Sequence, residues 1–331
     1  MVNENTKSIF ITGGAGYVGA QLVPSLLDHG YHVTVLDLMI YGDSVLEEHP
    51  KLKKIKGDIR DSALLKKLIP GHDAVIHLAC ISNDPSFELN PNLGKSINLD
   101  AFVPMLKIAK ESGVNRFIYA SSSSVYGIKE VENVHEEMSL QPLTDYSLYK
   151  ADCEKILQDY QSNNFTTVTV RPATVCGYSP RQRLDVVVNI LTNLAYHKRE
   201  VSVFGGNQLR PNIHIKDMVN VYLKLLDADE DLIGGEIFNA GDQNHTVLQL
   251  AEFAKEVIGD DVKLIQSSSD DNRSYHISSE KIHNILGFSP SHSIKEAMHD
   301  LKGAFENNLL IDPLNNPNYF NIKTMQNIEL K

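Results

Sequence analysis

A tyrosine and a lysine four residues apart, Tyr146 and Lys150, have the spacing in this chain that best fits acid–base chemistry. On a helix the two side chains would share one face. A free tyrosine has a pKa of about 10 and is a poor base near neutral pH, but a neighbouring ammonium group stabilises the phenolate. An ordinary amphipathic surface helix can carry the same pair, so the catalytic interpretation depends on its surroundings.

A run of four serines, residues 121–124, precedes this pair and follows a predicted strand. Ligands of open α/β sheets bind at the carboxyl ends of the strands, so the serines would lie beside a ligand. A hydroxyl there can hydrogen-bond a substrate oxygen while Tyr146 exchanges a proton with it. Serine runs are also common in loops that bind nothing. The order of the serines and the Tyr–Lys pair, both downstream of a dinucleotide loop, favours catalysis.

The dinucleotide loop is a glycine-rich segment between a predicted strand and a predicted helix. Residues 13–19 read Gly-Gly-Ala-Gly-Tyr-Val-Gly, so Gly14, Gly16 and Gly19 satisfy G-x-G-x-x-G. Glycines let a pyrophosphate approach the backbone amides at the helix N-terminus, where the helix dipole favours negative charge. The strand and helix around the loop favour a dinucleotide site over a glycine turn without a ligand.

Two aspartates follow the next predicted strands. Asp37 ends the second strand, eighteen residues beyond Gly19, where a carboxylate can accept hydrogen bonds from the adenosine ribose. A carboxylate there would also repel a 2′-phosphate, which predicts NAD rather than NADP. Asp58 follows the third strand and has two interpretations, a place beside the adenine or a cap for the helix that begins near Ser62.

Strands and helices that alternate through the first half of the chain would position these residues. Such alternation predicts a parallel sheet with helices on both faces. Gly30 and Gly113 stand where glycines end helices. The predicted strands are 8–12, 32–36, 52–56, 74–78, 116–120 and 167–170, and the predicted helices are 18–29, 62–68, 94–112 and 146–163.

The alternation weakens after about Gly177, which predicts a second, smaller unit. We expect an α/β fold with an NAD-binding Rossmann doubly wound parallel sheet in residues 1–176. A mixed α/β substrate lobe would follow in 177–306, with some segments returning to the sheet. Residues 307–331 are rich in Asn, Leu and Ile without a helical period, and their role stays open.

Composition excludes several classes of protein. The 331 residues carry 31 Lys and Arg against 42 Asp and Glu, a formal charge of −11, which disfavours nucleic-acid binding through a basic face. Cys80, Cys153 and Cys176 are odd in number and far apart, so we expect a reducing cytoplasm and no disulfide. No segment approaches the roughly 20 apolar residues of a membrane span. The histidines lack metal-site spacing, and we expect His77 and His214 to be core residues.

These motifs together carry a resemblance to a known family. From Ile9 to about Phe305 the chain resembles the extended short-chain dehydrogenase/reductase superfamily, in particular its NAD-dependent nucleotide-sugar epimerases and dehydratases. The segments that carry the resemblance are 12–19, Asp37, 57–58, 77–79, Asn98, 121–127, Tyr146 with Lys150, 171–172 and 210–217.

The resemblance implies a Rossmann domain, tightly held NAD and a homodimer formed through the helices near 94–112 and 146–163. It also implies that Tyr146 acts as acid and base, that Lys150 positions Tyr146 and the nicotinamide ribose, and that Ser122 is the hydroxyl partner. On the same basis the expected NAD-binding residues are Gly13, Gly16, Tyr17, Val18, Gly19, Asp37, Asp58, Ile59, Leu78, Ala79, Asn98, Tyr146 and Lys150.

Departures from the family pattern bear on the reaction and on the substrate. The dehydratase branch has an Asp-Glu pair directly after the catalytic hydroxyl residue, where this chain has Ser123 and Ser124, so 4,6-dehydration is not expected. Thr174 stands where an Asn often contacts the diphosphate, and residues 270–275 replace the usual Arg-Pro-Gly-Asp. For Arg181 and Arg183 a solvated surface loop is the alternative to a diphosphate role. The candidate substrate-binding residues are Ser82, Ser123, Ser124, Thr174, Arg181, Arg183, Arg210 and Arg273.

These inferences indicate an enzyme that oxidises C4 of a nucleotide-diphosphate sugar with NAD, and the make-up of the family favours a 4-epimerase. A net 4-dehydrogenase is the alternative with the same chemistry; it would release a 4-keto sugar, for example from a GDP-hexose or GDP-heptose in surface-polysaccharide synthesis. A non-catalytic nucleotide-binding protein is the alternative of another class, and the intact set of Tyr146, Lys150 and Ser122 argues against it. The nucleobase and the sugar stay open.

Overall fold

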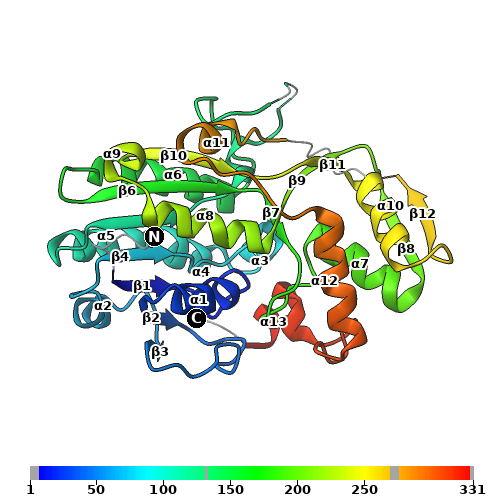
Figure 1. The fold of residues 1–331 in the computed structure, drawn as a ribbon, viewed down its shortest axis with the longest axis horizontal. Helices are drawn as coiled ribbons and strands as arrows, with labels where there is room; N and C mark the ends of the chain where they lie inside the picture. Colours follow the sequence, from blue (N-terminus) through cyan, green and yellow to red (C-terminus); the bar gives the residue numbers. More distant parts are fainter. Residues whose placement is uncertain (1–6, 130, 132, 269–275, 329–331) are drawn as a thin grey trace.

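The fold is built on a parallel sheet. The computed structural model describes residues 7–129, 131, 133–268 and 276–328 of the chain. Among these residues seven strands pair in the order β10-β6-β5-β4-β1-β2-β3 (Figure 1). Every neighbouring pair is parallel. The strands are β1 (Ser8–Thr12), β2 (His32–Asp37), β3 (Leu52–Lys56), β4 (Ala74–His77), β5 (Arg116–Ala120), β6 (Thr166–Pro172) and β10 (Glu236–Ala240).

Helices cover both faces of this sheet. Successive side chains of β1 enter opposite cores, since Ile9 and Ile11 pack with the helices of one face and Phe10 with those of the other. This arrangement confirms the predicted Rossmann-like α/β fold. The first face carries α1 (Gly19–Asp28), α8 (Ile215–Asp227), α9 (Glu230–Ile233) and α11 (Glu280–Leu286), and the second carries α2 (Ser62–Leu68), α5 (Phe102–Glu111) and α6 (Asp145–Tyr160).

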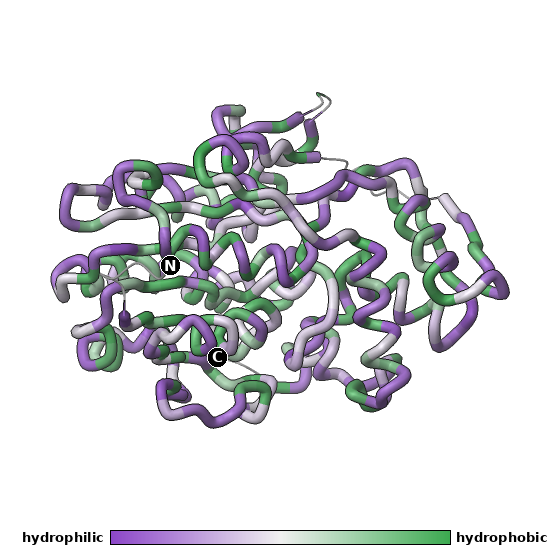
Figure 2. The backbone as a smooth tube through the Cα atoms, viewed as in Figure 1, coloured by the Kyte–Doolittle hydropathy of each residue, from purple (hydrophilic) through white to green (hydrophobic). Residues whose placement is uncertain are grey.

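A smaller lobe with its own apolar core lies beside the carboxyl end of the sheet (Figure 1). Hydrophobic and hydrophilic residues alternate along its helices in Figure 2, as expected for helices with one buried face. In the described ranges, no helix combines the length and the apolar character that crossing a membrane requires. The elements of this lobe are β7 (Thr174–Cys176), α7 (Val187–Lys198), β8 (Glu200–Phe204), β9 (Leu209–His214), β11 (Asn244–Thr246), α10 (Val247–Ile258), β12 (Lys263–Ser267) and α12 (Ile294–Glu306).

The helix expected at 94–112 is the clearest difference from the sequence prediction. It begins earlier, because Asn90 caps a helix whose first residue is Pro91, and it is divided into three parts. These parts are α4 (Pro91–Lys95), a π-helical turn at Ser96–Asp100, and α5. Gly30 and Gly113 do follow the ends of α1 and α5 with positive φ, as predicted.

The C-terminal segment, left open by the sequence, folds back against the molecule. It contains a 3-10 turn, η3 (Pro317–Tyr319), and a helix, α13 (Asn321–Ile328). The carbonyl oxygen of Tyr319 accepts a hydrogen bond from the backbone of Leu184 at 2.8 Å, and that of Pro313 accepts one from Asn193 at 3.0 Å. Figure 1 shows α13 below α12, next to the segment that follows β2. Tyr41, which follows β2, donates a hydrogen bond to the Asn321 side chain at 3.0 Å, so the segment contacts both lobes.

Candidate functional site

The glycine loop lines a chamber of about 420 Å³ at the carboxyl end of the sheet. A Cβ built on Gly16 meets only the carbonyl oxygen of Gly13, at 3.1 Å, so the side chain would otherwise project into open space. Gly13 itself has a φ of +75°, and a Cβ there would lie 2.6 Å from the backbone nitrogen of Ala79. The loop therefore leaves a cradle that a side chain would fill, which fits the pyrophosphate of a dinucleotide.

Replacing Gly16 by Ala should lower the affinity for NAD at least about tenfold, because the new methyl group projects into the cradle. Its one contact within 4 Å, with the Gly13 carbonyl oxygen at 3.1 Å, requires a small shift of the loop. Isothermal titration with NAD measures the effect. Gly303→Ala on α12 is the matched control, since a Cβ there meets nothing within 4 Å and lies far from the chamber. Equal NAD affinity in G16A and G303A would contradict the assignment of the loop.

Asp37 ends β2, Asp58 follows the end of the neighbouring β3 by two residues, and both line the chamber. The Asp37 carboxylate accepts backbone hydrogen bonds from Ala15 at 3.0 Å and Met39 at 2.8 Å. Burial raises the pKa of Asp37, and these hydrogen bonds oppose the rise. Asp58 is held by the guanidinium of Arg60, with the closest contact at 2.6 Å. The acidic side chain at the end of β2 is therefore fixed toward the chamber, as expected for a ribose contact.

The open question about Asp58 has a definite answer. The cap of α2 is Asp61, whose carboxylate accepts hydrogen bonds from the backbone of Ala63 and Leu64. Burial alone would raise the pKa of Asp58, but hydrogen bonds from Arg60 outweigh it and hold the pKa below its ordinary value. Asp58 is thus a charged residue of the chamber wall and not a helix cap.

The structure gathers most of the predicted NAD-binding residues in this chamber. Asn98 is the exception, because its side chain is not part of the wall: it accepts a hydrogen bond from the backbone of Ile81 at 2.8 Å and donates one back at 3.0 Å. It holds the segment after β4 in place, and its direct contact with the cofactor stays a prediction. The predicted residues that line the chamber are Gly13, Gly16, Tyr17, Val18, Gly19, Asp37, Asp58, Ile59, Leu78, Ala79, Tyr146 and Lys150.

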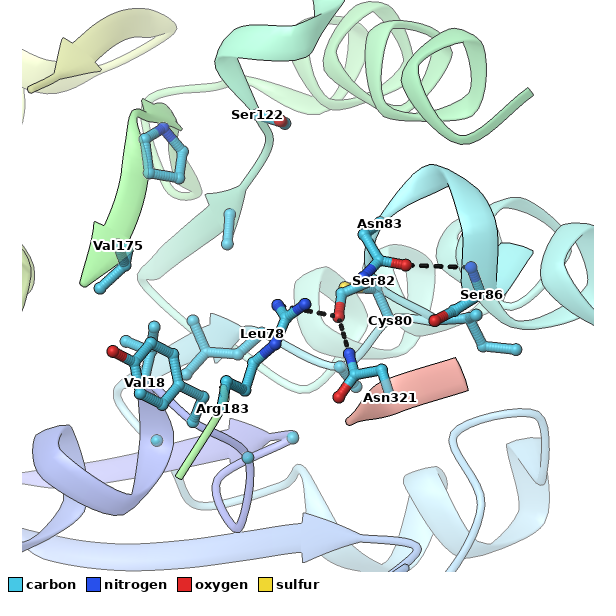
Figure 3. A pocket seen from close by; sticks show the side chains of 18 of the residues that line it. Val18, Leu78, Cys80, Ser82, Asn83, Ser86, Ser122, Val175, Arg183 and Asn321 are labelled. Carbon is cyan, nitrogen blue, oxygen red and sulfur yellow. Dashed lines mark hydrogen bonds between the residues drawn. The ribbon is translucent and has the colours of Figure 1, made fainter. Parts of the chain in front are cut away.

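The proposed catalytic residues share the chamber with the glycine loop. Tyr146 and Lys150 lie on the first turns of α6, which begins with a capping box. Ser122 precedes a 3-10 turn, η2 (Ser123–Tyr126), and its Oγ lies 2.9 Å from Oγ of Ser124. In Figure 3 Ser122 lies across the pocket from Arg183. The three side chains reach the cavity from two different elements.

The contacts of Lys150 differ from a simple ammonium–phenol pair. Its Nζ is buried, donates to the carbonyl oxygen of Ala120 at 2.6 Å and lies 5.9 Å from the centre of the Tyr146 ring. Burial raises the pKa of Tyr146; Cys80 and Asp84 act in the same direction, while the Ser122 hydroxyl opposes the rise. Tyr146 therefore holds its proton tightly in this arrangement.

A buried ion pair between Arg171 and Glu154 joins β6 to α6, the helix that carries Tyr146 and Lys150. Glu154 on α6 accepts hydrogen bonds from Arg171 on β6, at 3.0 Å from Nε and 2.6 Å from Nη2. Arg171 also donates to Tyr126 Oη at 2.7 Å, and Ser121 donates to Glu154. Ser121 and Tyr126 are the first and last residues of the segment 121–126, here called the serine turn, which contains η2. The network therefore fixes Ser122 relative to α6.

A second cavity, of about 670 Å³, shares part of its wall with the chamber. Arg210 and Phe204 line only this second cavity, whereas Arg181 and Arg183 line only the chamber. The expected substrate residues are therefore divided between two places, and Arg273 lies outside the described residues. Ser82 and Ser123 line the chamber only. The residues common to both cavities are Asn83, Asp84, Ser124, Thr174, Asp185 and Val186.

Tyr41, Asn321 and Met325 are among the chamber residues that the sequence did not predict. Tyr41 follows Asp37 closely enough that the end of β2 could have suggested it. Asn321 and Met325 belong to α13, for which the sequence offered no periodic signal. Their presence shows that the C-terminal segment contributes to the same cavity as the glycine loop.

The predicted core histidines are buried. His77 contacts Oγ1 of Thr12 at 2.6 Å, and burial lowers its pKa to about 3. His214 accepts a hydrogen bond from the backbone of Lys216, while its Nε2 has no hydrogen-bond partner among the described residues. In the part of the chain that the structure describes, no three His, Cys, Asp or Glu side chains form a group that could hold a metal ion.

Comparison with known proteins adds to this geometry. The NAD dependent epimerase/dehydratase family matches residues 9–241, which include the glycine loop, the serine turn and α6. The chain belongs to this family. The relatives found in this comparison are NAD-dependent enzymes that act on nucleotide sugars, and NAD is the cofactor of the family, as predicted.

Individual relatives cover nearly the whole chain. Residue identity is 30% over 327 residues with UDP-glucuronic acid decarboxylase 1 of Arabidopsis thaliana, which covers 93% of this chain and 72% of that protein. It is 26% over 305 residues with UDP-glucose 4-epimerase of Lactobacillus helveticus, covering 86% and 92%. The structure of UDP-glucose 4-epimerase from Thermotoga maritima with UDP-glucose superposes with a TM-score of 0.83 at 25% identity, covering 92% of this chain and all 100% of that one.

Proposed function

We propose that this family member is a 4-epimerase of a nucleotide-diphosphate sugar. One observation carries the proposal: Tyr146 and Ser122 line the NAD chamber, and Ser124 and Thr174 are common to that chamber and the second cavity. A sugar at this junction would lie within reach of the acid–base groups, while its nucleotide occupied the second cavity.

The protein's part in the reaction is proton transfer and orientation. Tyr146 keeps its proton in the arrangement described above; as a phenolate, a form that the Lys150 ammonium and the positive charge of bound NAD would both favour, its oxygen would take the proton of the C4 hydroxyl during oxidation and return it during reduction. The Ser122 hydroxyl would orient the same sugar oxygen. Lys150, held by the Ala120 carbonyl, keeps a positive charge near both the phenol and the cofactor ribose. The glycine loop and Asp37 would hold NAD, which would supply a reversible hydride acceptor for C4, so that an epimerase would consume no cofactor.

The choice of epimerase within the family has two supports. Two of the relatives described above are UDP-glucose 4-epimerases. In addition, Ser123 and Ser124 follow Ser122, and a pair of hydroxyls supplies no carboxylic acid for the loss of a sugar hydroxyl. Arg210, on β9 in the second cavity, is the proposed contact of the substrate diphosphate.

Proton NMR of the purified enzyme with a panel of UDP-, GDP-, CDP- and dTDP-sugars, without added electron acceptor, tests the proposal. Catalytic conversion of one sugar into a second with altered ring couplings is the expected result. A keto sugar limited to one equivalent per active site would instead indicate a net 4-dehydrogenase. Loss of the carboxyl carbon from a UDP-glucuronic acid sample would indicate a decarboxylase, the activity that names one relative.

Asp37 is the proposed determinant of the choice between NAD and NADP. We expect Asp37→Asn to reduce the preference for NAD over NADP at least about tenfold, because the neutral amide removes repulsion of a 2′-phosphate and weakens the ribose contact. The ratio of the two dissociation constants measures this effect. Asp43→Asn is the control, since Asp43 is exposed on the same segment and outside the chamber wall. An unchanged ratio in D37N would show that another residue selects the cofactor.

A further inference from the structure

The side chain of Asn321, at the start of α13, joins three segments that border the NAD chamber. Its amide oxygen accepts hydrogen bonds from Tyr41 Oη at 3.0 Å and from Arg181 Nη2 at 2.6 Å. Its amide nitrogen donates to Ser82 Oγ at 2.9 Å, as Figure 3 shows. The Asn321 backbone N–H donates to the Asp185 carboxylate at 2.8 Å. One buried residue thus ties the C-terminal segment to the ends of β2 and β4 and to residues 181–185.

Two arginines in this cluster have buried N–H groups without a hydrogen-bond acceptor among the described residues. Arg181 is 4% exposed, its guanidinium carbon lies 3.5 Å from the centre of the Tyr41 ring, and its Nε has no acceptor among the described residues. Arg183 pairs with Asp185 through Nε at 2.8 Å, while its buried Nη2 has no acceptor within the same ranges. Buried cationic donors without acceptors are costly, so these two fit an anionic ligand.

The location of the donors favours the dinucleotide over the sugar nucleotide as that ligand. A diphosphate is common to both, but both arginines line the chamber that holds Gly16 and Asp37. The second cavity has its own cationic side chains, Lys198 and Arg210. Figure 3 shows the Arg183 guanidinium directed at Ser82, between the glycine-loop side of the pocket and α13.

We propose that Arg181, Arg183 and Asn321 form a latch that binds the diphosphate of NAD and slows its release. The proposal rests on the NAD site of the proposed function. It assigns Arg181 and Arg183 to the cofactor, whereas the sequence analysis assigned them to the substrate. Within this latch the two arginines bind the diphosphate, and Asn321 is a positioning residue that acts through its hydrogen bonds with Arg181, Ser82 and Asp185. Met325 on the same helix also lines the chamber, so α13 must shift before NAD can leave on this side.

Release of NAD from Asn321→Ala tests the latch. The enzyme is loaded with radiolabelled NAD and diluted into excess unlabelled NAD, and the bound label is followed with time. We expect N321A to release NAD roughly 10- to 100-fold faster, the range for lost hydrogen bonds to charged groups. The dissociation constants of UDP and GDP, measured by calorimetry on the same samples, should change less than about twofold.

Arg183→Met provides a second test, because it removes the free donor and leaves Asn321 in place. We expect weaker NAD binding by a similar factor, and Arg183→Lys should recover part of it by restoring the charge. Asn318→Ala is the matched control: Asn318 is an exposed asparagine of the same segment, outside the chamber wall. Thermal unfolding of each variant confirms that the fold is retained.

The outcomes separate the latch from the proposed function. Wild-type NAD release in N321A and wild-type NAD affinity in R183M would overturn the latch and leave the NAD site standing. Weakened UDP or GDP binding with unchanged NAD binding would also overturn it, because the arginines would then serve the sugar nucleotide. A wild-type enzyme that binds no NAD would contradict the proposed function itself, and the latch with it.

Discussion

Tyr146→Phe should lower kcat roughly 10²- to 10⁴-fold, the usual contribution of a positioned general acid or base. The variant loses only the phenolic oxygen, so the ring still fills its place on α6, and the dissociation constant of NAD should stay within about twofold. Steady-state turnover of the substrate identified by NMR, together with NAD titration, measures both quantities. The loss should appear in kcat more than in KM, because the proton transfer belongs to the chemical step.

Tyr149→Phe is the matched control for this variant. Tyr149 lies three residues further along the same helix, packs against Phe87 with ring centres 5.7 Å apart, and is outside the chamber wall. We expect Y149F to keep full turnover. Full turnover in Y146F as well would exclude Tyr146 as the acid–base group and would direct attention to Asp84, which lines both cavities.

Arg171→Met should cost about 3–5 kcal/mol in the free energy of unfolding, because it leaves the Glu154 carboxylate buried without its partner. Both side chains of the pair are at most 3% exposed, and water cannot take the place of the guanidinium. Urea denaturation measures the loss. The double variant R171M/E154L should recover much of it, since an apolar pair leaves no buried charge.

Lys107→Met is the control for the effect of an ion pair in itself. Lys107 and Glu111 lie 3.8 Å apart on α5 with both side chains more than half exposed, and such surface pairs contribute less than about 1 kcal/mol. A loss below about 1 kcal/mol in R171M would mean that the pair under the catalytic helix contributes no more than a surface pair. Apolar packing would then be the main interaction that holds α6 in place.

The sequence predicted the elements whose patterns are local. β1, β3 and β5 begin and end where they were expected, because each is a short β-forming segment between polar or glycine-containing turns. The glycine loop was also recognisable, since the conformational demands of a phosphate cradle can be met by few residues. The spacing of Tyr146 and Lys150 predicted that they share one helix face, and their place downstream of the glycine loop and the serines suggested their role.

Features that depend on distant partners could not be predicted in this way. Arg171 and Glu154 form an ion pair because β6 and α6 pack together, and nothing in the sequence around either residue predicts this pairing. The partners of Asn321 lie between 136 and 280 residues away in the sequence. Asn98 has the residue type and position of a cofactor contact, yet its amide is used by Ile81. Which acceptor a polar side chain reaches is decided by packing and not by spacing.

The last strand of the central sheet joins after the chain has already left that sheet. β10 pairs with β6 from Glu236 beside Val168 to Ala240 beside Pro172, and the intervening segment contributes α7, β8 and β9 to the other lobe. A polypeptide ended after residue 176 would present β6 as a bare edge, with unpaired backbone groups that invite aggregation. The segments of the two lobes therefore alternate along the chain. A soluble fragment of the larger lobe must extend at least through β10.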